Sequence, residues 1–235
     1  MSAKRLGFIS MLGEPGTYST WVYDDIGGDN ECCWFKNTFG DLQDVEIICT
    51  RVSHGEPVLN PEDADCFILG GSYNSVHDDY SWQRELYVWF DKLHAVGKPL
   101  LAICGGHQLV SAYFGADVVY LNDPPMAGTQ AVELTACGVE SSLFSGIPPM
   151  PCFHFANYEH VLNPPANSTL LATHPRVTNA ALSFENGWYS TQFHPEATVA
   201  TLSRSWRDSY SELVGRYDDD DNGRQLIENF IYLAS

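Results

Sequence analysis

The chain has few basic residues. Its 235 residues include 12 Lys and Arg against 30 Asp and Glu, so the formal net charge is −18. This balance excludes an extended nucleic-acid-binding surface and disfavours binding to anionic membranes. Solubility or a salt-adapted host explains such a charge most simply, and docking on a basic partner is the alternative.

A long apolar run is also missing. The first apolar stretch lies within residues 1–9 and is soon interrupted by Gly13 and Pro15. It is too short for a signal peptide and far too short to cross a bilayer. We therefore expect a soluble, cytoplasmic protein.

Cysteine spacings typical of metal centres and disulfide frameworks are absent. The seven cysteines are odd in number and irregularly spaced, and no CxxC occurs. We therefore expect neither a structural metal nor a disulfide framework. The adjacent Cys32 and Cys33 are predicted to be ordinary thiols rather than a redox pair.

Nucleotide-binding signatures are missing as well. There is no GxGxxG, and Gly13–Gly16 is not followed by Gly-Lys-Ser/Thr. The acidic run Asp218–Asp221 resembles the start of a calcium loop, but Asn229 stands where a bidentate glutamate is needed, and Glu228 lies one residue early. The sequence thus predicts no cofactor, no metal, and a solvated acidic turn before the last helix.

What is present indicates one α/β domain over residues 1–235. A hydrophobic fraction of 44% suits a single core, and no repeat or low-complexity linker divides the chain. In the first half, short apolar runs alternate with helical patterns, which predicts a mixed, mainly parallel sheet flanked by helices. The expected strands are residues 6–11, 45–50, 66–69 and 100–103, and the expected helices are residues 82–96 and 106–114.

The second half is predicted to be more antiparallel. Asn186-Gly187 separates two apolar runs, residues 181–185 and 188–193, which is a strong signal for a hairpin. Residues 198–235 are expected to form a helical C-terminal extension. Its closing helix has apolar residues at helical spacing: Leu226, Ile227, Phe230 and Ile231.

Cys104 is the first candidate for chemistry. It follows an apolar strand and precedes Gly105-Gly106, so a sharp strand-to-helix turn would hold its thiol clear of the sheet. The start of the helix would place N–H groups and partial positive charge near the sulfur, which favours the thiolate. Cysteine is often only a small buried hydrophobe, but the glycine pair favours a nucleophile.

A histidine and a carboxylate follow much later, in His194-Pro195-Glu196. Residues two apart in an extended chain face the same side, and a proline disfavours helical backbone at the residue before it. A nucleophile, a base and an orienting acid are therefore available for the hydrolysis of an amide. His174-Pro175 has no acid within reach and is predicted to be a loop.

Gly70-Gly71-Ser72 follows another predicted strand. Glycines there allow the backbone to turn and to present an N–H to a developing oxyanion. Glycine pairs are common in turns, so this segment gains meaning only beside Cys104 and His194.

Residues 68–72, 99–108 and 192–196 together resemble the class I (triad-type) glutamine amidotransferase domain. The resemblance is greatest to stand-alone members similar to the amidotransferase half of GMP synthase. It implies a flavodoxin-like fold and attack of a thiolate on the carboxamide of glutamine. A γ-glutamyl thioester would form, and ammonia would be released.

The resemblance also implies a role for each site residue. Cys104 would be the nucleophile, His194 the acid and base, and Glu196 its orienter. The N–H groups of Gly71 and Gly105 would form the oxyanion hole. Gln108 and Gly70 would help to bind the substrate.

Three functions are consistent with these residues. The leading hypothesis is a glutaminase subunit that supplies ammonia to a separate synthetase, because the chain shows no ATP-binding signature for activating an acceptor. A γ-glutamyl hydrolase or peptidase would use the same triad with a different pocket. Residues 156–159, which replace the usual His-Gly-Asp-like segment of the family, motivate that alternative. A catalytically silent regulatory or binding protein is the third hypothesis, and the intact Cys104, His194 and Glu196 argue against it.

Overall fold

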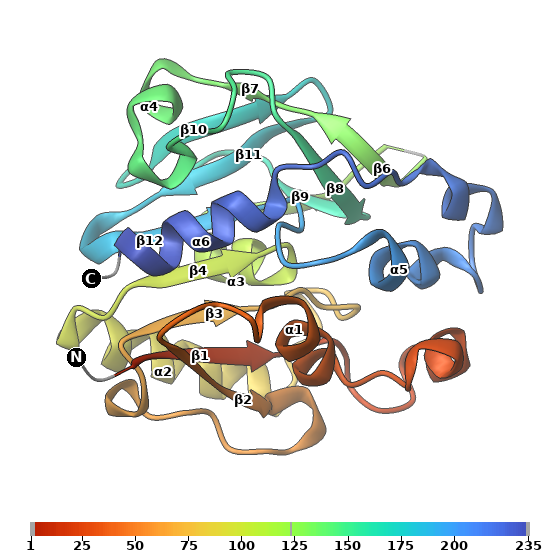
Figure 1. The fold of residues 1–235 in the computed structure, drawn as a ribbon, viewed down its shortest axis with the longest axis horizontal. Helices are drawn as coiled ribbons and strands as arrows, with labels where there is room; N and C mark the ends of the chain where they lie inside the picture. Colours follow the sequence, from red (N-terminus) through yellow and green to blue (C-terminus); the bar gives the residue numbers. More distant parts are fainter. Residues whose placement is uncertain (1–2, 123, 234–235) are drawn as a thin grey trace.

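The computed structural model describes residues 3–122 and 124–233. An eight-stranded sheet in the order β2-β1-β3-β4-β12-β11-β10-β7 runs through its centre, with helices on both faces (Figure 1). The strands from β2 to β12 are parallel, and those from β12 to β7 are antiparallel. The α/β class, the mainly parallel sheet and the antiparallel second half are therefore confirmed.

The bounds of the elements are as follows. The sheet contains β1 (Lys4–Ser10), β2 (Val45–Arg51), β3 (Cys66–Leu69), β4 (Leu100–Ile103), β7 (Glu133–Leu134), β10 (Thr169–His174), β11 (Val177–Ser183) and β12 (Trp188–Thr191). Two separate antiparallel pairs join β5 (Val118–Tyr120) to β9 (Glu159–Val161), and β6 (Met126–Ala131) to β8 (Cys152–Asn157). The α-helices are α1 (Glu31–Phe39), α2 (Ser81–Val96), α3 (Gly105–Tyr113), α4 (Ala136–Glu140), α5 (Val199–Leu202) and α6 (Gly223–Leu233). The 3-10 helices are η1 (Thr20–Ile26), η2 (Val52–His54), η3 (Pro61–Asp63), η4 (Ser142–Phe144), η5 (Glu185–Gly187), η6 (Ser203–Trp206) and η7 (Ser211–Arg216).

The apolar runs form strands because both faces of the central sheet are covered. In β4, Leu101 and Ile103 pack into the core cluster that contains α1 and α6, and Leu100 and Ala102 pack into the cluster that contains α2 and α3. A strand that is buried on both faces reads as a continuous apolar run rather than an alternating one. This explains why β3 and β4 have the predicted bounds.

The predicted hairpin is also present. β11 and β12 pair antiparallel, and the turn between them has left-handed backbone at Asn186 (φ 60°) and Gly187 (φ 69°). This backbone is the one that an Asn-Gly pair favours, and its twist matches that of the two strands. The hairpin places the end of β12 beside the end of β4, with which β12 pairs in parallel.

The prediction of free thiols is wrong for Cys32. Cys32, in the first turn of α1, forms a disulfide with Cys49 of β2, 17 residues away. The two thiols meet because α1 packs against β1 and β2, a tertiary contact that no cysteine spacing reveals. The neighbouring Cys33 is exposed and free, as expected.

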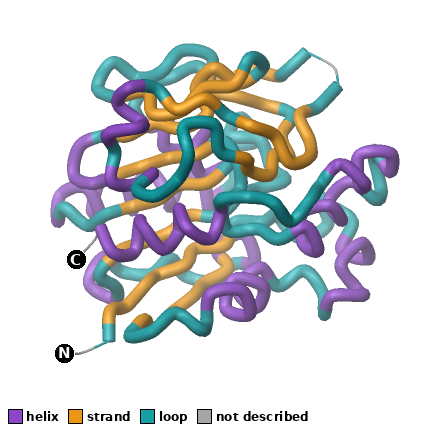
Figure 2. The backbone as a smooth tube through the Cα atoms, turned by 45° about the horizontal axis from the view of Figure 1, so that its top comes forward, coloured by secondary structure: helices purple, strands orange, loops and turns teal. Residues whose placement is uncertain are grey.

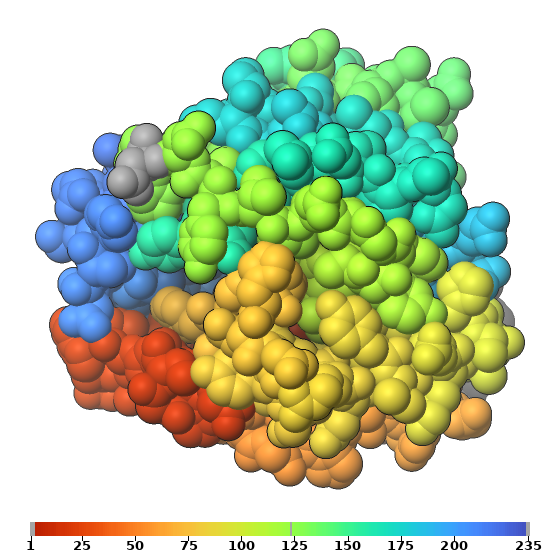
Figure 3. Space-filling model, turned by 180° about the vertical axis from the view of Figure 1, so that it is seen from behind, coloured from red at the N-terminus to blue at the C-terminus, as the bar shows by residue number. Residues whose placement is uncertain are grey.

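Segments from the two ends of the chain meet beside the sheet. Figures 2 and 3 show residues of η1 next to the short helices α5 and η6, and in Figure 3 the red and blue surfaces touch at one edge. Arg204 of η6 pairs with Asp25 of η1, with a nitrogen–oxygen distance of 2.8 Å. In the described part of the chain, no helix is long and apolar enough to span a membrane.

Candidate active site

Cys104 lies between the end of β4 and the start of α3. Its backbone has φ 51° and ψ −105°, a conformation that costs a non-glycine residue about 1–3 kcal/mol. The parallel pairing of β4 with β12 continues into this turn, because the Cys104 N–H donates to the carbonyl of Thr191 at 2.7 Å. The sharp strand-to-helix turn expected from the sequence is therefore present.

The close packing around this turn requires glycine. A Cβ at Gly106 would lie 2.9 Å from the carbonyl oxygen of Leu69 and 3.1 Å from that of Gly70. A Cβ less than 3.0 Å from a backbone oxygen would force the backbone to shift, and one at 3.1 Å would be unusually tight. The absence of a side chain at Gly106 thus allows the first turn of α3 to approach the end of β3.

His194 and Glu196 form a buried pair next to Cys104. Nδ1 of His194 lies 2.8 Å from Oε1 of Glu196, and the two side chains are 9% and 6% exposed. The pair lies in a turn that follows β12 rather than in an extended segment, because β12 ends at Thr191. The turn still brings the two side chains together, and it leaves Nε2 as the ring nitrogen that can serve Cys104 and a substrate.

The thiol and the imidazole meet at Gly71. A Cβ at Gly71 would lie 2.7 Å from Cε1 of His194 and 3.5 Å from Cβ of Cys104. Burial alone lowers the pKa of His194, but the negative charges of Glu196 and Cys104 raise it, and the net result is a pKa well above the usual value. The site therefore favours an imidazolium beside an anion.

These side chains open into one cavity of about 500 Å³. Its walls include the predicted residues Gly71, Cys104, Gln108, His194 and Glu196. The other two predicted residues lie behind the wall, since a Cβ at Gly70 would meet the carboxylate of Glu31 and one at Gly105 would meet Ser72. The structure therefore gathers most of the predicted residues around a single space.

The side-chain amide of Gln108 is held by hydrogen bonds to Glu159, which lines the cavity, and to Gln192, which lies beside it. Its Nε2 donates to the carbonyl of Glu159 at 2.9 Å and to Oε1 of Gln192 at 3.1 Å. The Nε2 of Gln192 in turn lies 3.6 Å from Sγ of Cys104. The amide of Gln108 thus fixes the wall of the cavity at residues 157–159, next to the thiol.

Glu31 is a residue of the site that the sequence reasoning missed. It lies in the first turn of α1, lines the cavity and is 7% exposed. Burial, and then the charge of Glu196, raise the pKa of its carboxyl group to about 8. The sequence carries no signal for it, because only the packing of α1 over the sheet brings this side chain close to His194 and Glu196.

Glu159 was missed as an individual residue. Its two carboxylate oxygens accept hydrogen bonds from Ser75 Oγ at 2.8 and 3.0 Å. The side chain of Asn157 donates to the Glu159 carbonyl at 2.9 Å. A polar end of the cavity is thus built from the segment that departs from the usual pattern of the family.

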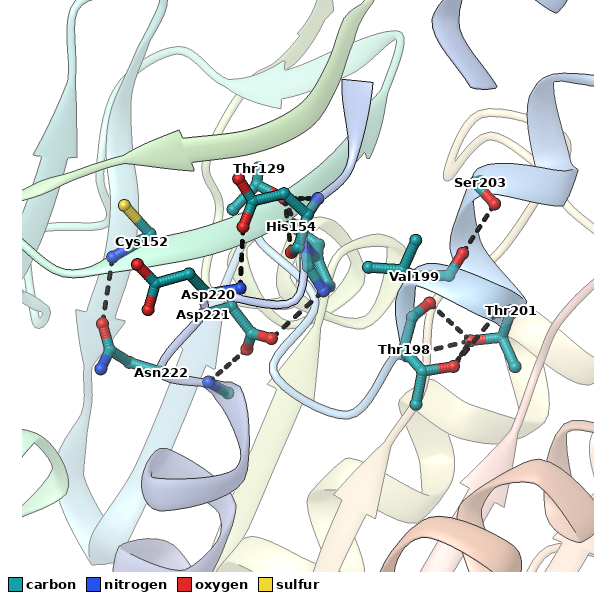
Figure 4. A network of polar contacts seen from close by, with 12 residues as sticks. Thr129, Cys152, His154, Thr198, Val199, Thr201, Ser203, Asp220, Asp221 and Asn222 are labelled. Atoms are coloured by element: carbon teal, nitrogen blue, oxygen red, sulfur yellow. Dashed lines mark hydrogen bonds and ion pairs between the residues drawn. The ribbon is translucent and has the colours of Figure 1, made fainter. Parts of the chain in front are cut away.

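The acidic run near the C-terminus contacts the site from behind. Figure 4 shows Asp221 next to His154, and the two side chains lie 3.3 Å apart, with Thr129 Oγ1 3.0 Å from the other ring nitrogen of His154. The carbonyl of His154 accepts the N–H of His194 at 2.8 Å. Asp221 therefore helps to anchor His154 of β8, whose carbonyl in turn holds the backbone of His194. Asp218–Asp220 are exposed, as expected for a solvated turn.

Within residues 3–122 and 124–233, no cluster of three His, Cys, Asp or Glu side chains could hold a metal ion. The arrangement described above is that of a buried thiol with an adjacent imidazole–carboxylate pair at the wall of a cavity. Such a constellation can attack a carbonyl carbon and transfer protons to and from a leaving group.

Comparisons with known proteins indicate the family to which this chain belongs. The family model for class-I glutamine amidotransferases matches residues 32–208. A glutamine-hydrolysing GMP synthase from Aeropyrum pernix is 32% identical over 120 residues, which are 51% of this chain and 23% of that protein. Gamma-glutamyl peptidase 5 from Arabidopsis thaliana is 29% identical over 186 residues, which are 76% of this chain and 71% of that protein.

A glutamine amidotransferase from Thermotoga maritima shares the fold, with a TM-score of 0.69 at 17% identity over 98% of this chain and 91% of the other. The match to the GMP synthase spans about a quarter of that relative's length. The family match, in contrast, covers most of the present chain, from α1 to the end of η6. This chain belongs to the class-I glutamine amidotransferase family.

Proposed function

We propose that this chain hydrolyses the γ-amide of glutamine and releases ammonia for a separate synthetase. The observation that carries the proposal is the convergence of Cys104, His194 and Glu196 at the wall of one cavity. The strained backbone at Cys104 supports it, because strain of this kind is concentrated at functional sites.

The proposed reaction has two steps. The Cys104 thiolate attacks the γ-carbonyl carbon, the carbon–nitrogen bond breaks, and His194 gives its proton to the leaving ammonia. His194 then takes a proton from water, whose oxygen attacks the γ-glutamyl thioester. Glutamate leaves, and the thiol is restored.

The remaining site residues would stabilise and orient the substrate. The N–H groups of Gly71 and Gly105 would receive the oxyanion. Gly71 lines the cavity, whereas Gly105 lies behind its wall but directly follows Cys104, so only its backbone N–H would take part. Glu159 offers a carboxylate for the α-ammonium group of the substrate. Gln108 and Gly70 would shape the pocket rather than bind directly, because the amide of Gln108 is already engaged and Gly70 lies against Glu31.

A synthetase partner would use the ammonia. The matched segment of the Aeropyrum pernix GMP synthase is about a quarter of that protein, so most of that relative has no counterpart in the match. The net charge of −18 suits a partner with a basic face, whose association would weaken as salt rises.

A second candidate is a γ-glutamyl hydrolase or peptidase with the same triad. The cavity of about 500 Å³ favours it, because that volume falls in the range of about 300–1,000 Å³ typical of sites for drug-sized ligands, which are larger than glutamine. The match to Gamma-glutamyl peptidase 5 over 76% of this chain also supports it.

Glutamate and ammonia release tests the proposal. The wild-type chain should produce both from glutamine, the rate should rise when a synthetase partner is added, and Cys104→Ala should abolish the activity. Faster turnover of γ-glutamyl peptides, unaffected by any synthetase, would favour the second candidate. Turnover that Cys104→Ala leaves unchanged would contradict both candidates, and no turnover of either kind of substrate by the wild type would favour a catalytically silent protein.

A further inference from the structure

The cavity that contains Cys104 has an aromatic end. Its walls there come from segments far apart in the sequence: Tyr18, Tyr23, Trp34 and Tyr73 on one side, and Tyr158 and Trp206 on the other. The rings of Tyr18 and Tyr73 stack at a centroid distance of 4.9 Å, and those of Tyr158 and Trp206 lie 5.4 Å apart. This end is built where η1 meets η6, beside the sheet (Figure 2).

The polar atoms of five of these six rings form hydrogen bonds inside the protein, and the hydroxyl of Tyr158 lies 3.5 Å from Oγ of Ser209. The hydroxyl groups of Tyr23 and Tyr73 bond to each other, and Tyr18 donates to Asp29. Nε1 of Trp206 donates to the hydroxyl of Tyr217 at 2.6 Å, and Nε1 of Trp34 donates to a backbone carbonyl. What the rings offer to a ligand is therefore apolar faces and edges rather than hydrogen-bonding groups.

Apart from His194, the ionisable side chains that line the cavity are acidic. Among the described residues that line it there is no Lys or Arg, whereas four carboxylic residues line it: Glu31, Glu159, Glu196 and Asp208. The arginines of the neighbouring segment, Arg204 and Arg207, both pair with Asp25. A ligand with a carboxylate at its far end, such as a γ-glutamyl dipeptide, would find no cationic side chain there.

Two groups of residues that line the cavity differ in chemistry. The polar end has Ser75, Glu159 and Asn157 linked by hydrogen bonds, which suits the amino-acid end of a γ-glutamyl group. The aromatic end then accommodates what is attached to the other side of the scissile amide. Ammonia, the leaving group of glutamine, has no apolar portion that could contact such a surface.

We infer that the aromatic end binds the amine portion of a larger substrate, and that this chain hydrolyses γ-glutamyl amides of apolar aromatic amines in addition to glutamine. This inference rests on the Cys104 chemistry proposed above. The thiolate forms a bond to the γ-carbonyl carbon, the carbon–nitrogen bond breaks, and His194 protonates the departing arylamine. Water then hydrolyses the thioester to glutamate, as in the reaction with glutamine.

The test compares kcat/KM for three substrates on the full chain: glutamine, γ-glutamyl-para-nitroanilide and γ-glutamylglycine. The wild-type chain should hydrolyse the anilide and should use γ-glutamylglycine poorly. Tyr158→Ala should lower the ratio of anilide to glutamine turnover by about tenfold, the order expected for loss of an aromatic contact. The anilide is the more reactive substrate in every variant, so a change in the anilide-to-glutamine ratio between variants reports binding rather than this intrinsic reactivity.

Two further variants make the test specific. Tyr158→Phe keeps the ring and should retain the wild-type ratio. Trp21→Ala removes an aromatic side chain of η1 that is 55% exposed and lies outside the cavity lining, so it should leave the ratio unchanged. Hydrolysis of glutamine without hydrolysis of the anilide, or an unchanged ratio in Tyr158→Ala, would overturn the inference and leave the proposed function standing. Failure to hydrolyse any of the three, or full activity in Cys104→Ala, would overturn both.

Discussion

At the scale of single residues, Cys104, His194 and Glu196 divide the proposed work unequally. In the proposed reaction the imidazole would move protons in both steps, whereas the carboxylate would orient the ring through one hydrogen bond of 2.8 Å. Both partners are buried, so removal of either leaves the other without its contact in a dry environment.

The first prediction concerns this division. His194→Ala should lower kcat for glutamine by about 10²–10⁴-fold, the usual contribution of general acid–base catalysis, and Glu196→Gln should lower it less, because the imidazole remains. Steady-state ammonia release measures both effects. His107→Ala serves as the control: His107 bonds to Ser190 in the core, and burial lowers its pKa to about 3, so it should affect stability rather than kcat. The reverse order of effects for His194 and His107 would reassign the base.

The second prediction concerns Glu31. Its pKa is raised from 4.5 to about 8, first by burial and then by Glu196, so the folded state binds a proton that the unfolded state has released. The resulting stability is fully present below pH 4.5 and is lost as the pH rises to about 8, by about 1.4 kcal/mol per pH unit. The free energy of unfolding should therefore fall more steeply from pH 5.5 to 7.5 in the wild type than in Glu31→Gln.

Denaturant titrations at the two pH values measure that difference. The variant is isosteric and permanently neutral, so the contributions of the other titrating groups largely cancel in the comparison. Equal slopes for the two proteins would show that Glu31 does not hold a proton in the folded state.

Cys104, His194 and Glu196 could be selected as candidates from the sequence because each carries a local signal. Cys104 has a glycine pair after it, and His194 has an acid two residues away. Glu31 and Trp206 have no such neighbours, and they reach the cavity only through the tertiary positions of α1 and η6. Residues of this second kind could not be predicted from local patterns.

At the scale of elements, the end of β3 and the start of α3 meet so closely that side chains are excluded. The third prediction follows from Gly71, where a Cβ would lie 2.7 Å from Cε1 of His194. Gly71→Ala should displace the imidazole and lower kcat by roughly 10²-fold, the cost of a displacement of about 1 Å at a reacting group. Gly215→Ala is the matched control, because nothing lies within 4 Å of a Cβ there. Wild-type kcat in Gly71→Ala would show that the ring is not held against this glycine.

The disulfide between α1 and β2 leads to the fourth prediction. It closes a loop with a sequence separation of 17, for which chain entropy predicts a stabilisation of about 3 kcal/mol. Cys49→Ser should lower the free energy of unfolding in urea by about that amount under oxidising conditions. Cys33→Ser, which removes the exposed free thiol of the same helix, should have little effect. If reduction of the wild type left its stability unchanged, the two sulfurs would not be bonded.

The elements that the sequence predicted are those with strong local patterns. β3, β4 and α2 are bounded by glycine, proline or a change in periodicity, and α6 has a clear apolar face. α1 was not predicted, because its apolar residues are few and cysteines, a lysine and an asparagine interrupt them. β6 and β8 were also missed, since they are stabilised by pairing with each other across more than 20 residues rather than by their own sequences.

At the scale of the whole molecule, the order of the strands depends on contacts between distant segments. β12 inserts beside β4, so Trp188 pairs with Leu100 and the end of β12 delivers His194 to Cys104. The alternation of strands and helices predicted the α/β class, but this insertion could be anticipated only from the resemblance to the family. The contact between η1 and η6, where Arg204 and Arg207 both pair with Asp25, likewise joins distant segments that no local pattern links.

The central claim is that Cys104 is the one thiol that attacks a γ-glutamyl carbonyl. The chain has four other free cysteines with which to compare it: Cys33, Cys66, Cys137 and Cys152. Burial raises the pKa of the Cys66 thiol to about 12, and Cys33 and Cys137 are exposed but have no imidazole beside them among the described contacts. Among the cysteines of the described residues, Cys104 is the one that lines the cavity, where His194 lies beside it.

The most direct test of this claim is intact-mass spectrometry after treatment with a glutamine analogue that carries a diazoketone in place of the carboxamide. We expect a single covalent adduct of γ-glutamyl type, mapped to Cys104 by peptide analysis, absent in Cys104→Ala and suppressed by excess glutamine. An adduct on Cys33, Cys66, Cys137 or Cys152, or an adduct of unchanged yield in Cys104→Ala, would contradict the account.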